Sequence, residues 1–410
     1  MKVLQINSVY KNGSTGKIVH DLSEYYLSKG YESIVCYGRH KPDSAPRAFK
    51  VCTELESKVN HLVSFFTGIM YGGFYVSNSR LKKIIKKERP DIIHLHCLNG
   101  YYLNIYRFVN WLNKSHFNVV LTLHAEFMYT ANCGYALECN KYLTGCGKCP
   151  RLKKETHSLF IDGTKKSWKL MKESFEGMKH LRIVSVSPWL LKRAKESPIL
   201  SSFEHSCVLN GIDTDIFKPF AKNEDESDYK TILHVTSYFN NDISNIKGGY
   251  YVLKLANLLK SKKIKFVVVG DYDHSIAYPS NVLFVGNVKD QIKLAKYYSS
   301  ADLTLLCSQK ETFSMIVAES LCCGTPIVGF KSGAPEQIAI QEYSQFVDYP
   351  DVDELLKVIL SFLNKPVDRD EIARRAKEKY SKNRMAEDYI RLYKDLIDEA
   401  DSTTRKRSNS

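Results

Sequence analysis

Short apolar runs alternate with amphipathic stretches along this chain, and the pattern begins again after residue 220. Apolar runs of this length are typical of buried parallel strands, and the stretches between them are typical of covering helices. In the first half the runs are Lys2–Asn7, Ser33–Tyr37, Asp91–Leu95, Val119–His124 and Arg182–Ser187. In the second half they are Thr231–Val235, Lys265–Val269, Val282–Val285, Leu303–Leu306 and Pro326–Phe330. The pattern predicts an α/β protein with two Rossmann-like domains facing across a central cleft.

The boundary between the two domains is expected near Pro219, where an acidic linker, Asn223–Tyr229, follows the first series. We therefore predict an N-terminal domain over residues 1–215 and a C-terminal domain over residues 216–385. Residues 386–410 are expected to form a helix that returns to the N-terminal domain, followed by a frayed basic tail, Arg405–Ser410.

Composition favours a folded protein without a membrane span. Of 410 residues, 44% are hydrophobic, which is enough to build two cores. The first residues lack the apolar run and cleavage site of a secretory signal. The most apolar stretch, Val59–Ser79, is interrupted by three glycines and diluted by polar residues. We therefore expect a cytoplasmic protein in which the scattered cysteines are reduced and act as small buried residues.

The net charge of +14 is concentrated in the first half of the chain. Residues 151–200 carry twelve Lys and Arg against five Asp and Glu, and residues 80–89 carry six against one. These charges are typical either of solvated helix faces or of a surface that attracts anionic lipid or a diphosphate. An apolar stripe precedes the basic run at residues 80–89 and predicts one face of a helix. This face belongs to the core or, alternatively, to a membrane interface, and its residues are Leu62, Phe65, Phe66, Ile69 and Met70.

The segment after the run Leu303–Leu306 carries the strongest functional signal. Glu311 precedes a predicted helix that begins around Ser314, and Glu319 lies inside that helix. Backbone amides at a helix N-terminus bind phosphate well, and ionised carboxylates accept hydrogen bonds from the hydroxyls of sugar and ribose rings. The predicted phosphate-binding amides belong to Thr312, Phe313 and Ser314.

Together with Cys323–Pro326, this segment resembles the Glu-x7-Glu signature of family 4 retaining glycosyltransferases, which have the GT-B fold. Further segments match this family in the expected order over nearly the whole chain. They are Gly13–Gly16, Asn210–Pro219, Lys247–Gly249, Val267–Gly270, Phe284–Gly286 and Gly333–Glu336. The resemblance, which is to members that build exopolysaccharide, implies a hexosyltransferase-type enzyme with a nucleotide-sugar donor.

The resemblance also implies roles for individual residues. Lys247 would neutralise the donor diphosphate, Glu311 would bind the transferred sugar, and Glu319 would bind the ribose. His124 matches a cleft histidine near the donor sugar, and the glycine-rich loop from Gly13 to Gly16 would approach the phosphate. No catalytic metal is expected, because a cation and helix amides can stabilise the leaving diphosphate.

Two departures from the family pattern bear on the site. The loop Ser237–Ile246 contains no Arg, so a second phosphate contact is missing from the place where many relatives have one. The residue after His124 is Ala125 rather than Asp, so any acidic role falls to Glu126. The acceptor is expected to be a glycan or a lipid-diphosphate-linked glycan at the inner membrane face, with an anionic membrane as a candidate partner.

Four cysteines lie close together in a glycine-rich insert at residues 130–150. Four thiols that end in a Cys-x2-Cys pair suit a structural zinc site, although free thiols or disulfides are open alternatives. These cysteines are Cys133, Cys139, Cys146 and Cys149.

Other functions explain less of the chain. His124-Ala-Glu126 with Cys146-x2-Cys149 imitates a zinc deaminase signature, but leaves the second domain unexplained. The basic charge alone would allow nucleic-acid binding, but it lacks the arrangement of a recognition surface, and no nucleic-acid partner is expected. A sugar-nucleotide epimerase of the same fold is the remaining alternative.

Overall fold

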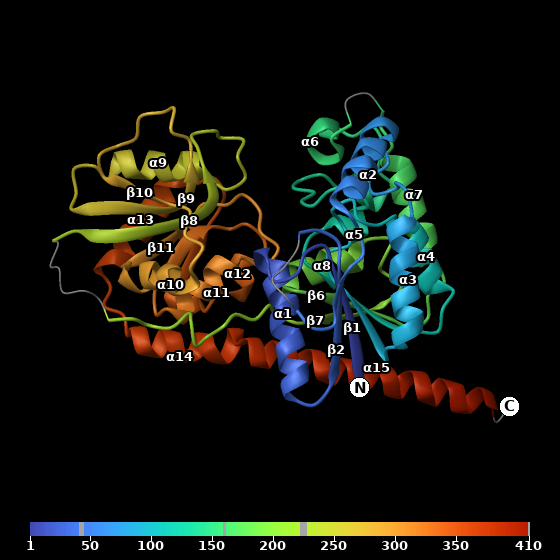
Figure 1. The fold of residues 1–410 in the computed structure, drawn as a ribbon. Helices are drawn as coiled ribbons and strands as arrows, with labels where there is room; N and C mark the ends of the chain where they lie inside the picture. Colours follow the sequence, from blue (N-terminus) through green and yellow to red (C-terminus); the bar gives the residue numbers. More distant parts are fainter. Residues whose placement is uncertain (41–44, 159–160, 222–227, 409–410) are drawn as a thin grey trace. The chain divides into compact units, whose positions relative to one another are not determined.

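A computed structural model describes residues 1–40, 45–158, 161–221 and 228–408 of the chain (Figure 1). The chain divides into two compact units. Unit 1 comprises Met1–Leu209 and Met385–Ser410, and unit 2 comprises Asn210–Arg384. Unit 1 thus ends at Leu209 rather than at residue 215, and the C-terminal segment belongs to it. Most of the acidic linker, residues 222–227, lies outside the described residues.

Unit 1 contains a parallel sheet in the order β3-β2-β1-β4-β5-β6-β7. Its strands are β1 (Lys2–Asn7), β2 (Glu32–Tyr37), β3 (Ala48–Lys50), β4 (Ile92–Leu95), β5 (Asn118–Leu123), β6 (Leu181–Ser185) and β7 (Glu204–Cys207). Its helices are α1 (Gly13–Ser28), α2 (Glu54–Thr67), α3 (Val76–Glu88), α4 (Ile105–Asn113), α5 (Phe127–Thr130), α6 (Leu152–Thr156), α7 (Thr164–Phe175) and α8 (Pro188–Glu196).

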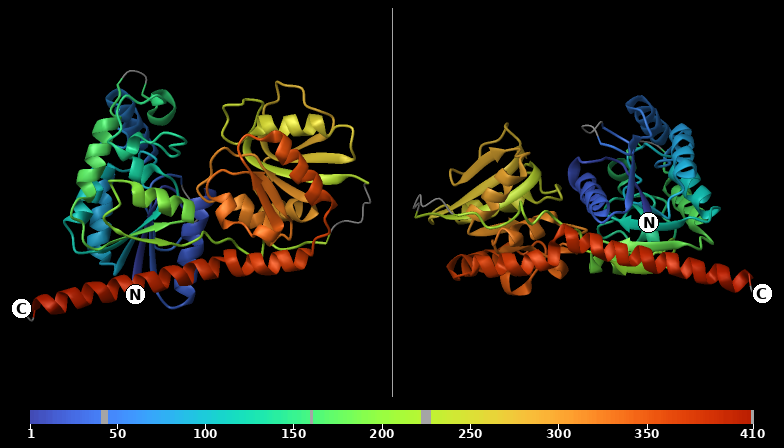
Figure 2. Two further views of the ribbon diagram at one scale, coloured as in Figure 1. Left: turned by 180° about the vertical axis from the view of Figure 1, so that it is seen from behind. Right: turned by 60° about the horizontal axis from the view of Figure 1, so that its bottom comes forward.

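The C-terminal helix α15 (Lys382–Ser408) completes the core of unit 1. Buried side chains of α1 and α15 form one apolar cluster with Val3, Ile92 and Val120 of the central strands. Helices α3, α4 and α7 cover the other face of the sheet, as Figures 1 and 2 show. The apolar strands are therefore shielded from water on both faces, which is why they read as continuous apolar runs.

Unit 2 contains a second parallel sheet, in the order β10-β9-β8-β11-β12-β13. Its strands are β8 (Lys230–Phe239), β9 (Ile264–Tyr272), β10 (Val282–Gly286), β11 (Leu303–Leu306), β12 (Ile327–Phe330) and β13 (Ser344–Val347). Its helices are α9 (Gly249–Leu258), α10 (Gln291–Ser300), α11 (Met315–Cys322), α12 (Pro335–Ile338), α13 (Val352–Asn364) and α14 (Arg369–Tyr380).

Both sheets have the doubly wound order in which the strand sequence reverses beside the first strand. In unit 1 the reversal falls between β1 and β4, and in unit 2 it falls between β8 and β11. Loops that leave the carboxyl ends of the strands on either side of such a reversal diverge, and a ligand crevice opens between them. The fold therefore locates one candidate binding region in each unit.

All ten predicted strands are present, and three further strands were not predicted. The additional strands β3, β7 and β13 lie at sheet edges. Edge strands are short and partly exposed, so their sequences lack the apolar run that marks a central strand. The structure also lengthens some predicted strands. Strand β9 continues through Tyr272, and β8 continues through Phe239, so the loop expected from Ser237 begins at Asn240.

Two helical predictions need correction. Helix α2 ends at Thr67, so Ile69 and Met70 lie beyond the helix on which the apolar stripe was expected. Helix α15 continues to Ser408. The tail that was predicted to fray from Arg405 onward is therefore helical as far as Ser408. Among the described residues, no helix combines the length and the apolar character needed to cross a bilayer.

Candidate active site

Lys247 lies in the loop that leaves β8, immediately before α9. Gly248 caps this helix with a left-handed backbone, φ 74°. A Cβ atom on Gly248 would lie 2.0 Å from the carbonyl oxygen of Cys307, the residue that follows β11. Glycine is needed here because the loop after β8 touches the end of β11. Lys247 is therefore held at the strand reversal of unit 2.

Gly248→Ala is expected to destabilise unit 2 more than Gly286→Ala does. Both glycines have a positive φ, 74° and 77°, so both substitutions impose a left-handed conformation that costs roughly 1–2 kcal/mol. A Cβ atom on Gly286 meets no atom within 4 Å, whereas one on Gly248 collides with backbone. Thermal melts of the two variants measure the difference. Equal melting temperatures would contradict the close approach of the two loops.

Lys247 forms an ion pair with Glu311, the first of the two predicted glutamates. The Nζ atom lies 2.8 Å from Oε1, although the residues are 64 positions apart in sequence. The Glu311 side chain is 9% exposed and the Lys247 side chain 31% exposed. The structure thus brings the predicted phosphate-binding cation and the predicted sugar-binding carboxylate together at the ends of β8 and β11.

A third predicted segment, Gly333–Glu336, anchors Glu311 from the end of β12. The Glu311 N–H donates to the Ser332 carbonyl at 2.9 Å, and the Ala334 N–H donates to the Glu311 carbonyl at 3.2 Å. These bonds form a short parallel bridge between Glu311 and Gly333. The backbone of Glu311 is therefore fixed on both sides, which leaves its carboxylate as the adjustable part.

The helix that follows Glu311 begins one residue later than predicted. Ser314 is the N-cap of α11 rather than its first residue, and it has an unusual φ of 76°. A positive φ in a serine is strained, and such strain collects at ligand-binding loops. Because a helix leaves its first backbone N–H groups without intrahelical partners, the amides at the start of α11 provide a favourable site for an anion.

Three buried polar atoms around this loop have no hydrogen-bond partner among the described residues. They are the Oγ atoms of Ser314 and Ser332 and the Nε2 atom of His234 in β8. His234 was not predicted, although a histidine inside an apolar strand is a visible signal. Its Nδ1 lies 3.0 Å from the Leu305 carbonyl oxygen, and burial lowers its pKa to about 4. The ring is therefore neutral, with Nδ1–H donating and an acceptor lone pair on Nε2.

Glu319, the second predicted glutamate, lies on α11 and is held by α10. The phenol of Tyr298 donates a hydrogen bond of 2.9 Å to its carboxylate. Tyr298 is fully buried, and burial together with the Glu319 charge raises the pKa of the phenol well above its ordinary value. The phenol therefore stays protonated and orients the carboxylate. Tyr298 is a positioning residue that the sequence analysis missed.

In unit 1, the glycine-rich segment forms the first turn of α1 rather than a loop. Helix α1 begins at Gly13, and Gly16 lies inside it. A Cβ atom on Gly16 would lie 3.2–3.4 Å from atoms of Val9, Tyr10 and Lys11, so the chain after β1 packs tightly on the helix start. The predicted glycine-rich loop is therefore a helix N-terminus beside the strand reversal of unit 1.

His124 follows β5 and belongs to a chain of three histidines. Its Nε2 lies 3.1 Å from Nδ1 of His96, which follows β4. His96 packs against His94 with ring centroids 3.9 Å apart. Burial lowers the pKa of His124 to about 4 and lowers the pKa of the other two well below the ordinary value. His94 and His96 were not predicted, because only the sheet brings them next to His124.

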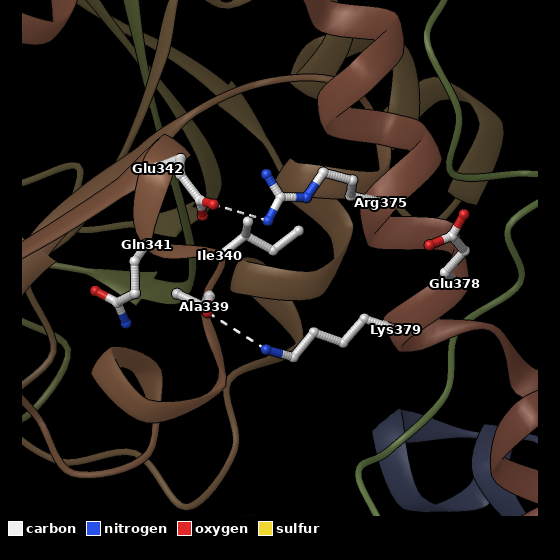
Figure 3. Close-up of a pocket in the computed structure, with 7 residues that line it drawn as sticks. All are labelled: Ala339, Ile340, Gln341, Glu342, Arg375, Glu378 and Lys379. Carbon is white, nitrogen blue, oxygen red and sulfur yellow. Dashed lines mark hydrogen bonds and ion pairs between the residues drawn. The ribbon is translucent and has the colours of Figure 1, made fainter.

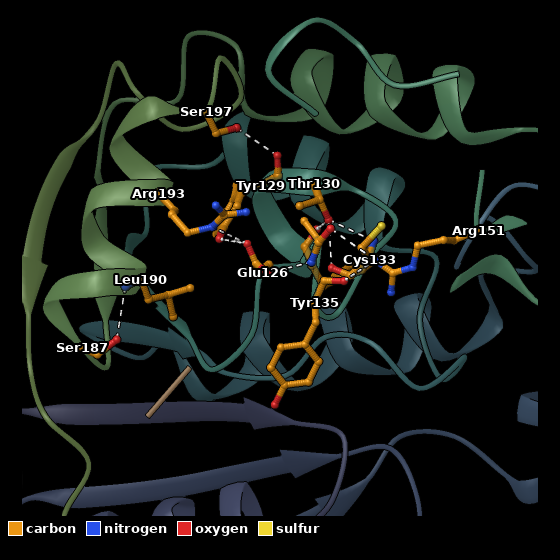
Figure 4. A network of polar contacts seen from close by, with 12 residues as sticks. Glu126, Tyr129, Thr130, Cys133, Tyr135, Arg151, Ser187, Leu190, Arg193 and Ser197 are labelled. Atoms are coloured by element: carbon orange, nitrogen blue, oxygen red, sulfur yellow. Dashed lines mark hydrogen bonds and ion pairs between the residues drawn. The ribbon is translucent and has the colours of Figure 1, made fainter. Parts of the chain in front are cut away.

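Glu126 does not have the free carboxylate that a catalytic acid or base needs. Its side chain is fully buried and forms an ion pair of 2.7 Å with Arg193 of α8. The Tyr129 phenol and the Ala136 N–H donate to the same carboxylate at 2.6 and 2.7 Å. Figure 4 shows Arg193 reaching toward Glu126 from α8 and Tyr129 close by. Glu126 therefore ties the start of the cysteine-rich insert to α8.

The structure does not bring the four clustered cysteines together as a metal site, and zinc binding stays a prediction. Within the part of the chain that the structure describes, no group of three or more Cys, His, Asp and Glu side chains is placed to hold a metal ion. Burial raises the pKa of the Cys146 thiol to about 11 and also raises the pKa of Cys133 and Cys149. Without a metal ion these thiols are therefore protonated at neutral pH, and zinc binding would have to displace their protons.

A pocket of about 440 Å³ in unit 2 lies apart from the predicted donor residues. Figure 3 shows Arg375 and Lys379 of α14 on one side, with Arg375 paired to Glu342 at 2.9 Å. None of the predicted site residues lines this pocket. In unit 2, the predicted residues Lys247 and Glu311 lie instead in the loops that follow β8 and β11.

Comparison with known proteins identifies both halves of the chain. Residues 15–216 match the family model "Glycosyltransferase Family 4", and residues 217–379 match "Glycosyl transferases group 1". An Escherichia coli K12 protein named as a colanic acid biosynthesis glycosyl transferase, WcaC, is 22% identical over 97% of this chain and 100% of its own length. Nothing in these comparisons supports an epimerase or a deaminase.

Solved structures share the fold. Sucrose-phosphate synthase of Thermosynechococcus elongatus matches with a TM-score of 0.67 and 16% identity, over 97% of this chain and 99% of that chain. Anabaena HepE, in complex with UDP-glucose, matches with a TM-score of 0.62 and 13% identity, over 96% and 100%. With two Rossmann-like units of matching strand order, the chain belongs to the GT-B glycosyltransferases that combine a family 4 domain with a group 1 domain.

Proposed function

We propose that this glycosyltransferase moves a sugar, with retention of configuration, from a nucleotide-diphosphate-sugar to a hydroxyl of a glycan or lipid-linked acceptor. The observation that carries the proposal is the ion pair between Lys247 and Glu311 at the strand reversal of unit 2. The N-terminus of α11 and the oriented carboxylate of Glu319 lie in the same segment. This arrangement supplies a cation, backbone N–H donors and two carboxylates that can accept hydrogen bonds from hydroxyl groups.

In the proposed reaction, the bond between the sugar and the diphosphate breaks, and negative charge develops on the leaving phosphate oxygen. Lys247 and the amides of Thr312, Phe313 and Ser314 would stabilise that charge. Glu311 pairs with Lys247 in the described structure, and would hold hydroxyls of the transferred sugar once Lys247 contacts phosphate. Fixed donors that match the transition-state charge lower the barrier without a metal ion.

Further residues are assigned supporting roles in this proposal. Glu319 would accept hydrogen bonds from the ribose hydroxyls, and the start of α1 from Gly13 to Gly16 would offer backbone donors to phosphate or acceptor. His124 would contact the transferred sugar. A sugar or ribose hydroxyl is also a matching partner for the buried lone pair on Nε2 of His234.

The names of similar proteins suggest a donor and a pathway class. HepE was solved with UDP-glucose, and WcaC is named for colanic acid biosynthesis. By analogy, we propose a UDP-sugar as the first donor to test and surface polysaccharide biosynthesis as the role. We place the enzyme in the cytoplasm, at the inner face of the membrane where lipid-linked acceptors are assembled.

A thermal-shift screen with nucleotide-sugars tests the donor assignment. A ligand that binds only the folded state raises the melting temperature, and at 100 times its Kd the gain is about 2.7 kcal/mol. We expect at least one nucleotide-diphosphate-sugar to stabilise the wild type and to stabilise Lys247→Ala less. If no nucleotide-sugar changes the melting temperature at millimolar concentration, the proposed donor class is wrong.

Glu319→Gln and Tyr298→Phe are expected to weaken donor binding to different extents. Glu319→Gln replaces a charged acceptor by a neutral one, and hydrogen bonds to charged groups contribute about 1.5–3 kcal/mol, so KM for the donor should rise roughly 10- to 100-fold. Tyr298→Phe only frees the carboxylate from its anchor and should raise KM about 5-fold. The neighbouring Tyr297→Phe is the matched control. Unchanged KM in Glu319→Gln would remove Glu319 from the site.

A further inference from the structure

Helix α2 exposes four of its apolar side chains on one face and buries polar side chains on the other. The apolar face of α2, defined as Leu55, Val59, Leu62 and Phe66, spans roughly 60° of the helix surface at 100° per residue. Leu55, Leu62 and Phe66 are 72%, 54% and 63% exposed. The opposite face carries Ser57, Asn60 and Ser64, all of which are buried.

The buried polar face is what holds the helix in place. Asn60 donates to the Tyr101 carbonyl at 3.0 Å and accepts from the Phe74 N–H at 2.8 Å. The Ser57 hydroxyl donates to the Gly100 carbonyl at 3.3 Å. These bonds fix the rotation of α2, so its apolar face cannot turn inward without breaking them. An apolar stripe of this kind that stays exposed marks an interaction surface.

Two further apolar side chains, on chain segments close to α2, are also exposed. Phe74, whose backbone is bonded to Asn60, is 59% exposed, and Ile161 is 51% exposed. A Cβ atom on Gly68, at the end of α2, would lie 2.2 Å from the Ile161 carbonyl oxygen, so Ile161 lies beside the helix end. Chain segments close to α2 therefore also expose apolar side chains.

Positive charge borders one side of the apolar face. Lys58 lies between Leu55 and Leu62 on the helix surface and is exposed. The ring of His61 contacts the ring of His157, with centroids 5.9 Å apart, and this contact joins α2 to α6, where Lys153 and Lys154 are exposed. Figures 1 and 2 show α2 and α6 at the same end of unit 1. Within the described chain, no ion pair involves these three lysines.

The acidic residues of α2 do not cancel this charge. Glu54 is paired with Lys50 at 2.9 Å, and Glu56 is paired with Arg80 at 2.7 Å. The local surface thus combines an apolar stripe with uncompensated lysines, which is the composition of helices that lie in an anionic bilayer surface. A second copy of the chain fits less well, because pairing two such faces would bring their lysines together.

We propose that the apolar face of α2, with Lys58, Lys153 and Lys154 beside it, docks unit 1 on a membrane surface rich in anionic lipid. Leu62 and Phe66 enter the headgroup boundary, and the lysines contact lipid phosphates. This inference deepens the acceptor part of the proposed function, since a lipid-linked acceptor is met at such a surface.

Vesicle flotation of the full-length protein tests the docking face. Wild type should float with vesicles of equal parts phosphatidylcholine and phosphatidylglycerol at low salt, and much less with phosphatidylcholine alone. Leu62→Glu with Phe66→Glu should lower the bound fraction at least 10-fold. The matched control is Leu283→Glu with Ile292→Glu in unit 2, where the side chains are 50% and 49% exposed; it should bind like wild type.

Three outcomes overturn the proposal: wild type that does not float, an α2 variant that floats equally well, or light scattering that shows a dimer lost in the α2 variant. The last outcome would assign the face to a second copy. Donor hydrolysis without acceptor is measured in parallel, and we expect it to be unchanged in the α2 variant. Loss of flotation with intact hydrolysis therefore concerns the docking face alone, and not the transferase assignment.

A second inference rests on the histidine chain of unit 1. The Gln5 amide Nε2 donates to the Val19 carbonyl at 3.2 Å, and a carbonyl can only accept. The orientation of the amide is thereby set, and its Oε1 faces Nε2 of His96 at 3.3 Å. His96 must therefore carry its proton on Nε2, and as a neutral ring it has an acceptor lone pair on Nδ1.

That lone pair determines the tautomer of the next ring. Because His96 Nδ1 accepts, His124 must donate from Nε2–H, and its Nδ1 is left as an acceptor. We infer that Gln5 and His96 are positioning residues that hold His124 in the Nε2–H tautomer, which makes its Nδ1 an acceptor rather than a donor. The inference rests on the proposed role of His124, but the tautomer is measurable without any substrate.

Long-range proton–nitrogen NMR spectra of the nitrogen-15-labelled protein distinguish the two tautomers. We expect the Nε2–H pattern for His124 in wild type, with its signals identified by their absence in His124→Gln. Gln5→Met should populate both tautomers and lower kcat about 10-fold with little change in KM for the donor. His234→Gln, which removes a buried histidine of unit 2, should leave the His124 signals unchanged. An Nδ1–H pattern in wild type, or an unaltered pattern in Gln5→Met, would refute the inference.

Discussion

Lys247→Ala should lower the rate of sugar transfer roughly 10²- to 10³-fold, because it removes a fixed cation from the leaving diphosphate. The Lys247 ammonium pairs with Glu311 in the segment that leads into α11, so in the proposed site the lysine and the helix N-terminus would act on the same phosphate. The amides of α11 remain in the variant and account for the residual activity. Steady-state kinetics with donor and acceptor measure kcat and KM.

The control for this prediction is Lys263→Ala, which removes an exposed ion pair with Asp228 in the same unit. It should leave kcat unchanged. Glu311→Gln should also lower kcat, and the double variant Lys247→Ala with Glu311→Gln should be less than additive, because the residues contact each other. Full activity in a folded Lys247→Ala would reject the proposed donor site.

Glu126→Ala should destabilise unit 1 by about 3–5 kcal/mol, because it leaves the Arg193 guanidinium in a buried site without its carboxylate. Burial by itself would lower the pKa of Arg193, and the Glu126 charge more than reverses that effect. The variant also removes the acceptor of the Tyr129 phenol and of the Ala136 N–H. For a unit of this size the melting temperature should fall by roughly 10 °C.

Glu371→Ala is the matched control, since Glu371 also pairs with an arginine, Arg374, but at an exposed site on α14. Exposed pairs contribute little, so this variant should melt like wild type. Calorimetry of both variants gives the comparison. If Glu126→Ala melted like wild type, the network in Figure 4 would not anchor the cysteine-rich insert. Loss of transfer activity in Glu126→Ala without loss of stability would instead restore a catalytic role for Glu126.

The proposed donor segment of unit 2 could be recognised in the sequence because its parts are contiguous. A strand, a polar loop and a helix start follow one another from Leu303 to Glu319, and each has a recognisable pattern. The carboxyl ends of parallel strands meet at one sheet edge, so the loops after β8 and β11 were expected to be neighbours. The geometry of Ser314 was not predictable, since a positive φ in serine depends on the surrounding chain.

The predicted zinc site, in contrast, could not be judged from local sequence alone. Four cysteines within seventeen residues satisfy the spacing that a metal site needs, but spacing does not place four sulfur atoms around one point. The insert is instead held by a buried carboxylate and by backbone hydrogen bonds, such as that from the Cys133 N–H to the Thr130 hydroxyl. The local sequence does not reveal whether a metal ion, or the buried carboxylate together with hydrogen bonds, holds the insert.

The sequence by itself determined the fold class, the central strands and the chemical types of the proposed donor residues, because apolar periodicity and helix starts are properties of neighbouring residues. Only the tertiary structure decided the ion pair between Lys247 and Glu311, the contact between His96 and His124 and the outward apolar face of α2. Each of these depends on which surfaces pack together. A side chain's exposure, or its hydrogen-bond partner, is set by elements that are distant along the chain.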